Sequence, residues 1–258
     1  MIPNIIHQTW KSKSDIPKNF SIWRNSFIEL NPNFTINLHD DLDNRNLLIE
    51  HLPQLLSVYD NFPREIFRVD FIRAVYLFFY GGIYADMDVQ CLKPLDRYLS
   101  LSGVYLAKMG EQEDFPHSIP NAMMASSKGC GFWMFYILKM VELSYTPYTH
   151  NSPEYITGPV ALKTSALEFN SNIETSKQKV TEFINHFQIP LDVSIMDFSL
   201  VNIMDSNVWF PLDWNDGEHL KFREKILSNE LFLDRHEASK LFSNSEMVTY
   251  WTHTWGKN

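Results

Sequence analysis

Residues 81–88 read Gly81-Gly82-Ile83-Tyr84-Ala85-Asp86-Met87-Asp88, a glycine pair followed by a short apolar run and two aspartates. A glycine pair typically ends a helix, and an apolar run of this length is typical of a buried strand. In an extended or tightly turning backbone, carboxylates at positions i and i+2 can act on one point. Such oxygen donors suit Mg²⁺ or Mn²⁺. A solvated acidic turn gives the same pattern, so Asp86 and Asp88 become a metal site only if their surroundings support it.

The segment before the glycine pair predicts a helix that ends at about residue 80. Asp60 or Asn61 can cap its start, and Pro63 suits its first turn because a proline lacks the N–H that would be unpaired there. Asp70 and Arg73 lie within this otherwise apolar helix. Their spacing is that of an ordinary surface ion pair. The alternative is a pair that points into a cleft.

Strands alternate with helices along the first half of the chain, which predicts a mainly parallel sheet covered on both faces. Expected strands lie at 5–10, 34–38, 83–88, 104–107, 122–125 and 248–255, and expected helices at 20–31, 40–56, 61–80, 131–144, 160–169, 221–228 and 237–242. Mixed structure with short strands is expected over 170–214. Ligands of such sheets bind beyond the carboxyl ends of the strands, where Asp86 and Asp88 would lie.

The composition argues against several classes of partner. The 258 residues are 45% hydrophobic and 21% charged, which is ordinary for a protein with a packed core. The net charge is −9 and no run of Lys and Arg occurs, so nucleic acid is not an expected partner. An anionic protein that binds an anionic nucleotide needs a cation between them, which favours a metal-dependent site.

Cysteine usage and hydropathy indicate a cytoplasmic protein. Cys91 and Cys130 lack metal-ligand spacing, and we expect both to be buried thiols in a reducing compartment. The most apolar stretch, residues 74–80, is far shorter than the roughly 20 residues that cross a bilayer. No signal-peptide pattern precedes the first strand. We therefore expect no transmembrane segment, although peripheral contact with a membrane stays open.

Three segments in this order resemble glycosyltransferase family 32: Pro3-Asn4-Ile5-Ile6-His7-Gln8-Thr9-Trp10, Phe67-Arg68-Val69-Asp70-Phe71-Ile72-Arg73, and residues 81–88. That family includes α-1,6-mannosyltransferases, α-1,4-galactosyltransferases and capsular sugar transferases, and its motif order recurs in the clostridial glucosylating toxins. The resemblance is strong over residues 3–99. It implies a GT-A fold, a Mn²⁺ or Mg²⁺ cofactor, a nucleoside-diphosphate sugar as donor and retention of anomeric configuration.

The resemblance also implies roles for single residues. Trp10 matches the aromatic residue that stacks on the nucleobase, and Asp70 and Arg73 match the pair that contacts the donor sugar and phosphate. Tyr84 matches a strand tyrosine beside the donor. Asp86 matches the acid near ribose and metal.

Asp88 matches the direct metal ligand, so the expected catalytic set is Asp70, Arg73, Asp86 and Asp88. Weaker matches follow at Asn121, which could contact the sugar or simply form a turn, and at Thr157-Gly158-Pro159, which could be a helix start.

The C-terminal segment Tyr250-Trp251-Thr252-His253-Thr254-Trp255 resembles the family's closing segment less well. Thr254 and Trp255 line up with its Ser-Trp pair and are candidate donor contacts. His253 is a candidate metal ligand or an ordinary strand histidine. His7, in the first strand, is expected to be a core histidine.

We expect one domain over residues 1–258, with residues 1–110 binding the nucleotide sugar and metal and residues 111–258 forming the acceptor side. The expected activity is transfer of a hexose from a UDP- or GDP-sugar to a hydroxyl acceptor, such as a glycan in bacterial or viral polysaccharide biosynthesis. The alternatives are a non-catalytic nucleotide-sugar-binding relative and a metal-dependent nucleotidyltransferase. The second would need a glycine-rich loop or basic phosphate clamp near the aspartates, which the sequence lacks.

Overall fold

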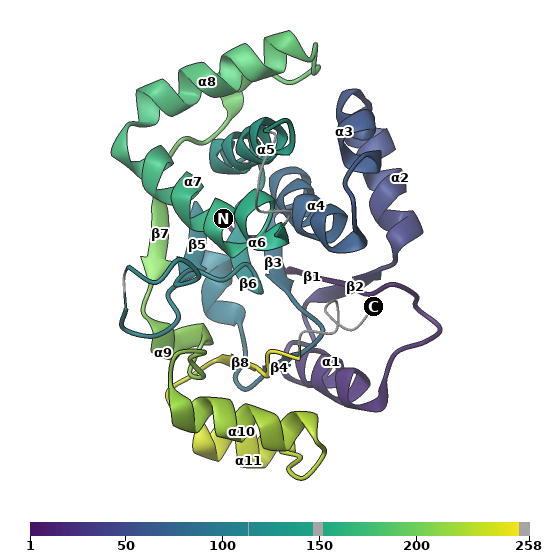
Figure 1. Ribbon diagram of the computed structural model, residues 1–258, viewed down its shortest axis with the longest axis vertical. Coiled ribbons are helices and arrows are strands. Elements are labelled where there is room, and N and C mark those ends of the chain that lie inside the picture. Colours follow the sequence, from purple (N-terminus) through teal and green to yellow (C-terminus); the bar gives the residue numbers. More distant parts are fainter. Residues whose placement is uncertain (113, 147–151, 253–258) are drawn as a thin grey trace.

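A six-stranded sheet, in the order β2-β1-β3-β6-β5-β7, crosses the centre of the molecule, and β4 and β8 form a second, two-stranded sheet (Figure 1). The computed structural model describes residues 1–112, 114–146 and 152–252. The strands are β1 (Ile5–Thr9), β2 (Thr35–His39), β3 (Gly82–Ala85), β4 (Val89–Cys91), β5 (Val104–Ala107), β6 (Met123–Ser126), β7 (Val201–Met204) and β8 (Met247–Thr249).

The central sheet is mostly parallel, as predicted, with one reversed strand. β1 pairs in parallel with β2 and β3, and β5 pairs in parallel with β7. β6 runs antiparallel to both of its neighbours, β3 and β5. The carboxyl ends of β1 and β3 therefore meet at one edge of the sheet, where the segment containing Asp86 and Asp88 begins.

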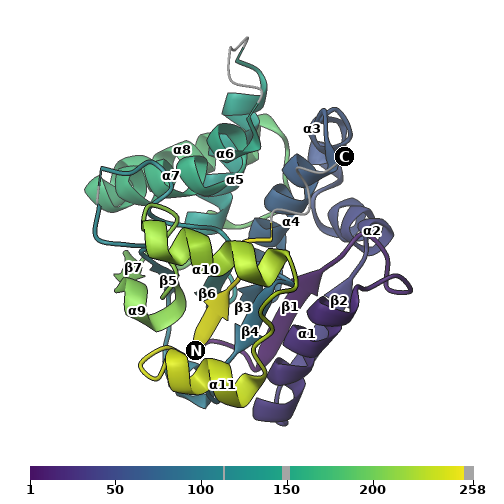
Figure 2. The same cartoon turned by 60° about the horizontal axis from the view of Figure 1, so that its bottom comes forward.

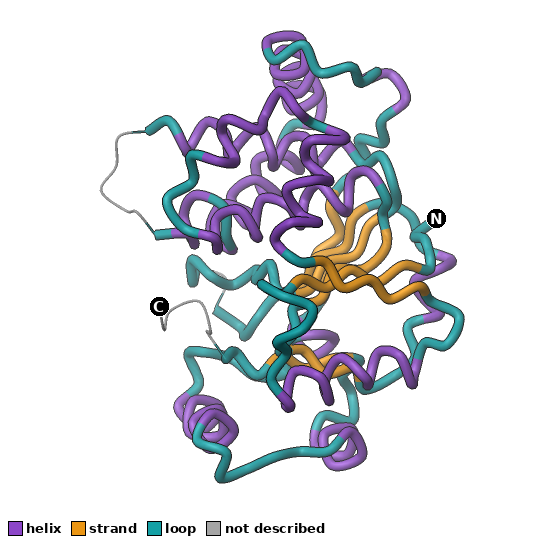
Figure 3. Tube along the Cα trace, turned by 90° about the vertical axis from the view of Figure 1, so that its right-hand side faces the viewer, coloured by secondary structure: helices purple, strands orange, loops and turns teal. Residues whose placement is uncertain are grey.

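Helices cover both faces of this sheet (Figures 1 and 3). They are α1 (Lys18–Leu30), α2 (Asp41–His51), α3 (Leu56–Asp60), α4 (Glu65–Phe79), α5 (Gly131–Ser144), α6 (Pro153–Ile156), α7 (Pro159–Ser171), α8 (Ile173–His186), α9 (Ser206–Trp209), α10 (Gly217–Leu227) and α11 (Arg235–Leu241), with 3₁₀ turns η1 (Pro53–Leu55), η2 (Asp96–Ser100) and η3 (Val193–Ile195). One face carries α4, α5 and α7, whereas α1, the β4–β8 sheet, α10 and α11 lie on the other (Figure 2).

Strand β3 shows why both faces must be covered. Its residues alternate between two hydrophobic clusters, because successive strand side chains point to opposite faces. Tyr84 joins the cluster on the α4 and α5 face, and Ile83 and Ala85 join the cluster beneath α1 and β8. All three residues are fully buried. This double burial identifies β3 as a central strand, as its unbroken apolar run predicted.

Helix α4 begins later than predicted. Asp60 ends α3 and pairs with Arg45 at 2.8 Å, so its carboxylate is not available as a cap. Arg64 has an extended backbone and α4 starts at Glu65. At its other end the prediction holds, because Gly81 has φ +67° and its N–H donates to the carbonyl of Leu77 at 3.1 Å.

Two predictions for the second half of the chain differ from the structure. One missed a helix, and the other made the last strand too long. The region expected to be mixed and short-stranded contains the 14-residue helix α8. Ser176, Val180, Phe183 and Ile184 are buried along one side of α8, a helical period that the polar residues between them obscured. The last strand, expected over residues 248–255, is only Met247–Thr249.

Candidate active site

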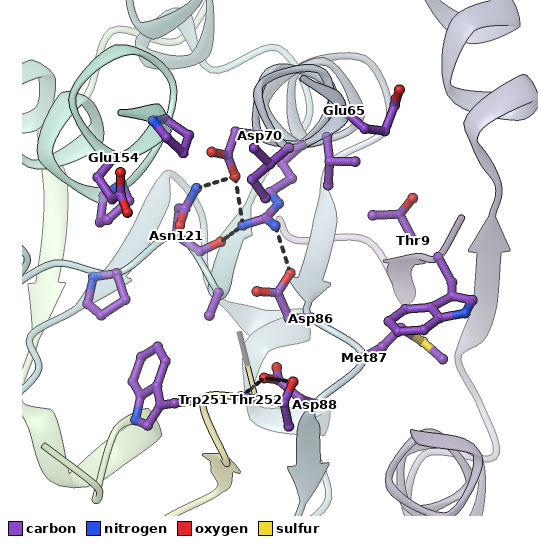
Figure 4. Close-up of a pocket in the computed structure, with 18 of the residues that line it drawn as sticks. Thr9, Glu65, Asp70, Asp86, Met87, Asp88, Asn121, Glu154, Trp251 and Thr252 are labelled. Carbon is purple, nitrogen blue, oxygen red and sulfur yellow. Dashed lines mark hydrogen bonds and ion pairs between the residues drawn. The ribbon is translucent and has the colours of Figure 1, made fainter. Parts of the chain in front are cut away.

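A cavity of about 450 Å³ opens beyond the carboxyl ends of β1 and β3. Its walls come from the end of β1, from α4, from the Asp86–Asp88 turn, from the loop before β6 and from the segment after β8 (Figure 4). These segments are far apart in sequence and meet because both parallel strands end at this edge. The cavity is thus where the sequence predicted a ligand.

Arg73 lies between two aspartates at the base of this cavity. Its Nη1 atom is 3.3 Å from Asp70 Oδ1, and its Nη2 atom is 3.0 Å from Asp86 Oδ1. Asp70 is 4% and Arg73 is 5% exposed. The pair is therefore buried beneath the cavity, and the surface ion pair that its spacing also allowed is excluded.

Asp70 receives further hydrogen bonds from two distant segments. Asn121 donates its side-chain amide to Asp70 Oδ1 at 2.8 Å, and Thr157 donates its hydroxyl to Oδ2 at 3.2 Å. The carbonyl of Asn121 accepts from Arg73 Nη1 at 3.0 Å. The weaker sequence matches at Asn121 and Thr157 therefore meet at the same carboxylate. Figure 4 shows the bond from Asn121.

Burial dominates the electrostatics of this cluster. It raises the pKa of Asp70 to about 7 and that of Asp86 to about 6, although Arg73 opposes both shifts. Burial alone would lower the pKa of Arg73, but Asp86, Tyr84 and Asp70 more than offset it, and the net pKa is raised. Arg73 is thus a permanent positive charge between two carboxyl groups that bind protons more readily than usual.

Tyr84 lies beneath the site rather than on its surface. Its hydroxyl donates to Asp86 Oδ1 at 2.7 Å, and the Arg73 guanidinium lies 4.8 Å from the centre of its ring. Tyr84 is fully buried and does not line the cavity. From this position it would act on a bound ligand through Asp86 and Arg73.

Asp86 and Asp88 occupy one turn and are held differently. The contacts of Asp86 with Arg73 and Tyr84 both use Oδ1. Asp88 accepts from the backbone N–H of Thr252 at 2.8 Å and from its hydroxyl at 3.0 Å, both on Oδ2. Asp88 Oδ1 also accepts a longer hydrogen bond, 3.4 Å, from the Thr249 hydroxyl. Asp86 Oδ2 and Asp88 Oδ1 are therefore the oxygens that can serve a ligand.

This pair fits a divalent metal of the kind that shares its shell with phosphates. Mg²⁺ usually binds one or two protein carboxylates and completes its shell with water and substrate phosphates. Among residues 1–112, 114–146 and 152–252, no group of three or more His, Cys, Asp and Glu could hold a metal. The predicted third ligand, His253, lies outside the described residues, as do Thr254 and Trp255.

Trp10 lines the cavity directly after β1. Its indole ring packs at 4.7 Å from the ring of Phe20, and its N–H donates to the carbonyl of Asp15 at 2.8 Å. These contacts fix the ring at the cavity wall, where its aromatic face could carry a planar ligand.

Thr252 is a site residue that sequence reasoning did not identify. Trp251, before it, has φ +51°, which is rare for a bulky residue. This conformation places the Trp251 ring against Phe210 while the next residue reaches Asp88. Thr252 reaches Asp88 because β8 pairs with β4. No local signal in the sequence could have revealed this contact.

Other predictions fall outside the cavity. His7 is buried in the core, where it stacks on Tyr76 and hydrogen-bonds the carbonyl of Gly81 at 3.0 Å, as expected for a core histidine. Cys91 and Cys130 are buried free thiols, also as expected. In the described part of the chain, no helix is both long and apolar enough to span a bilayer.

Comparison with known proteins identifies the family. The family described as "Glycosyltransferase sugar-binding region containing DXD motif" matches residues 17–115, which include Asp70, Arg73, Asp86 and Asp88. Over this stretch the chain is similar to the DXD-motif glycosyltransferases. This is the family that the three sequence segments resembled.

Curated proteins similar to this chain come from fungi and a virus. Inositol phosphoceramide mannosyltransferase 3 of Schizosaccharomyces pombe is 33% identical over 162 residues, which cover 62% of this chain and 44% of the relative. Mannosyl phosphorylinositol ceramide synthase CSH1 of Saccharomyces cerevisiae is 27% identical over 83% of this chain and 54% of its own length. An uncharacterized glycosyltransferase, L373, of Acanthamoeba polyphaga mimivirus is 35% identical over 42% of this chain and 43% of its own. The chain thus spans about half the length of these relatives.

A solved structure supports the predicted fold class. The PaToxG glycosyltransferase superposes with a TM-score of 0.51 and 16% sequence identity, covering 73% of this chain and 79% of the other. At this identity the likeness concerns the fold alone. Together with the mostly parallel sheet flanked by helices, it confirms the GT-A class of α/β fold.

Proposed function

We propose that this chain is a metal-dependent, retaining glycosyltransferase that moves a hexose from a nucleoside-diphosphate sugar to a hydroxyl acceptor. The observation that carries this proposal is the ion-paired cluster of buried Asp70 and Arg73 with half-buried Asp86, at the base of a cavity that Asp88 also lines. Several relatives are named mannosyltransferases, so a mannosyl donor is the first to test. A cytoplasmic location and a glycan acceptor remain predictions.

Each site residue has a proposed task in this reaction. Trp10 stacks on the nucleobase, Asp70 and Asn121 orient the donor sugar by hydrogen bonds, and Arg73 supplies a fixed positive charge. Asp86 and Asp88 would hold Mn²⁺ or Mg²⁺. Such an ion, when bound, neutralises the diphosphate and stabilises it as a leaving group. Stabilisation of charge that grows on the leaving oxygen is usually the largest contribution to a rate of this kind.

Retention of the anomeric configuration can be achieved in two ways. The acceptor hydroxyl attacks from the same face that the diphosphate leaves, or a carboxylate of the enzyme first acts as nucleophile. Both oxygens of Asp70 already accept hydrogen bonds, from Asn121 and from Thr157, so its geometry suits orientation better than nucleophilic attack. We therefore favour same-face attack by the acceptor hydroxyl. A trapped covalent glycosyl-enzyme would contradict this choice.

The decisive experiment measures release of nucleoside diphosphate from GDP-mannose, UDP-glucose and UDP-galactose in the presence of MnCl₂. We expect turnover of one donor, and we expect Asp88→Asn to lower it by about 10²- to 10³-fold. Asp96→Asn is the matched control, because Asp96 is exposed and does not line the cavity.

Unchanged turnover in Asp88→Asn would contradict the metal assignment. Binding of a nucleotide sugar without any turnover would indicate a non-catalytic relative, and release of pyrophosphate would indicate a nucleotidyltransferase.

A further inference from the structure

One wall of the cavity has no task in the donor chemistry above. It is formed by His117 from the loop before β6, Glu154 from α6, Trp214 from the segment before α10, and Trp251 after β8. Glu154 and Trp251 lie on one side of Asp70 and Asp86, and Thr9, which precedes Trp10, lies on the other (Figure 4). The cavity thus has two ends, with the aspartates between them.

The aromatic rings of this wall brace one another. Trp214 packs edge-on against Trp251 with ring centres 5.3 Å apart, and Trp251 stacks on Phe210 at 5.6 Å. The imidazole of His117 lies 5.6 Å from Trp214 and stacks on Phe115 at 5.4 Å. Rings held in this way present fixed apolar surface to a ligand at little cost in conformational entropy.

Two buried polar atoms of the same wall lack partners. Within the described residues, Glu154 Oε2 and His117 Nδ1 are shielded from solvent and make no hydrogen bond. A buried polar atom without a partner costs free energy, and more so when it belongs to a carboxylate. Such atoms beside a cavity call for a ligand that brings its own hydrogen-bonding groups.

The backbone of Glu154 is fixed relative to the donor carboxylate. A Cβ atom at Gly158 would lie 2.9 Å from Glu154 Cα and 3.3 Å from Asp70 Oδ2, so Gly158 leaves almost no space between α6 and Asp70. Thr157, the neighbouring residue, donates to Asp70. The Glu154 part of this wall is therefore packed close to Asp70.

We propose that His117, Glu154 and Trp214 form the acceptor subsite, and that it takes a six-membered polyhydroxylated ring, a pyranose or a cyclitol. This inference rests on the proposed function. With the base at Trp10, the diphosphate at Asp86 and Asp88 and the donor sugar at Asp70, the acceptor must enter from the opposite end.

In this arrangement the ring's C–H face packs on Trp214, and its hydroxyls bond to Glu154 and His117. Glu154 is a positioning residue. The acceptor oxygen forms the new bond to the anomeric carbon as the bond from that carbon to the diphosphate breaks, and the hydroxyl proton passes to the leaving phosphate oxygen.

The test measures binding of methyl α-D-mannopyranoside, myo-inositol and glycerol by ligand-observed NMR to the protein saturated with MgCl₂ and either UDP or GDP. We expect a ring polyol to bind and glycerol to bind at least about 10-fold more weakly, because an acyclic polyol lacks a face to stack. Glu154→Gln should weaken binding of the ring by about 10-fold or more, because it removes a charged acceptor while keeping the side chain's size.

Two controls separate a binding role from a structural one. Glu154→Gln should keep the Kd for the nucleoside diphosphate within about twofold, and Glu174→Gln, an exposed change on α8, should bind the ring like the unmodified protein. Ring binding that Glu154→Gln leaves unchanged, or that is no tighter than glycerol binding, overturns the acceptor subsite. Failure of both UDP and GDP to bind the unmodified protein contradicts the proposed function instead.

Discussion

Arg73 is buried between the carboxyl groups of buried Asp70 and half-buried Asp86, and its charge stabilises both of them there. Asp70 and Asp86 approach opposite ends of its guanidinium, and the ring of Tyr84 covers one face. Burying charges costs several kcal/mol per ion unless partners and hydrogen bonds compensate it. The cluster therefore keeps two acids beneath the cavity at an energetic cost that a purely structural core would avoid.

Removing the Arg73 charge should destabilise the whole protein. We expect Arg73→Met to lower the free energy of unfolding by on the order of 3–5 kcal/mol, because it leaves the buried carboxyl group of Asp70 and the half-buried one of Asp86 without their counter-charge. Arg45→Met is the matched control, since Arg45 and Asp60 form an exposed pair, and it should leave the unfolding midpoint nearly unchanged. Urea unfolding followed by tryptophan fluorescence measures both, and equal effects would contradict this account of the cluster.

At the scale of elements, the corner between α4 and β3 places the site. Gly81 and Gly82 have φ of +67° and +95°, values that residues with a side chain rarely adopt. They let the chain turn directly from the helix that carries Arg73 into the strand that leads to Asp86. A longer connection would separate the two halves of the cluster.

Gly82 should be nearly intolerant of a side chain. A Cβ atom there would lie 2.4 Å from the carbonyl oxygen of Ile5 in the paired strand, whereas one at Gly129, with φ +77°, would meet nothing within 4 Å. We expect Gly82→Ala to cost at least about 3 kcal/mol of unfolding free energy or to prevent folding. Gly129→Ala should cost only the backbone strain of about 1–2 kcal/mol. Thermal unfolding of both variants compares them, and similar melting temperatures would refute the steric argument.

His7 links β1 to this corner and should make the fold sensitive to acid. Burial, together with the charge of His39, lowers its pKa from 6.5 to about 4. The unfolded chain therefore binds the proton more readily, so the stability that neutral His7 contributes is present above about pH 6.5 and is lost as pH falls toward 4.

We expect the free energy of unfolding of the unmodified protein to fall, relative to that of His7→Phe, by on the order of 3 kcal/mol between pH 7 and pH 4. Urea unfolding at several pH values tests this. His39 is present in both proteins. Subtracting one free energy of unfolding from the other therefore removes most of the contribution that protonation of His39 makes. A pH-independent difference would show that His7 does not titrate as its burial requires.

At the scale of the whole molecule, charge opposes the proposed donor. The net charge is −9. The described lining of the cavity includes two side chains with a permanent positive charge, Lys11 and Arg73, against the six acidic residues Asp41, Glu65, Asp70, Asp86, Asp88 and Glu154. A nucleoside diphosphate brings further negative charge. A cation bound between them would offset this repulsion.

Removing divalent metal should therefore abolish nucleotide binding. We expect UDP or GDP to raise the melting temperature in MnCl₂, because a ligand that binds only the folded state stabilises it by mass action. The shift should vanish in EDTA and return with excess MnCl₂. A shift of the same size in EDTA would contradict the metal's role at Asp86 and Asp88.

The parts of this fold that sequence patterns predicted are those that local chemistry determines. Helix α5 occupies Gly131–Ser144 as expected, since its residues are apolar on nearly every side. The reversal of β6 was not predictable, because strand direction depends on how the chain returns to the sheet. In the site, Asp70 and Arg73 were identifiable from their place in an apolar helix, whereas Thr252 was not, because its contact with Asp88 spans 164 residues.

That long-range contact also sets the order in which the proposed donor site can be assembled during protein synthesis. At about 5–20 residues per second, a ribosome needs roughly 8 to 33 s to proceed from Asp88 to Thr252. Until then the DXD segment is present in the nascent chain, but nothing from the chain's end holds the Asp88 carboxylate or covers β4. A chain that is still being translated would thus carry the motif without the fixed site, and transfer would wait until synthesis has passed residue 252.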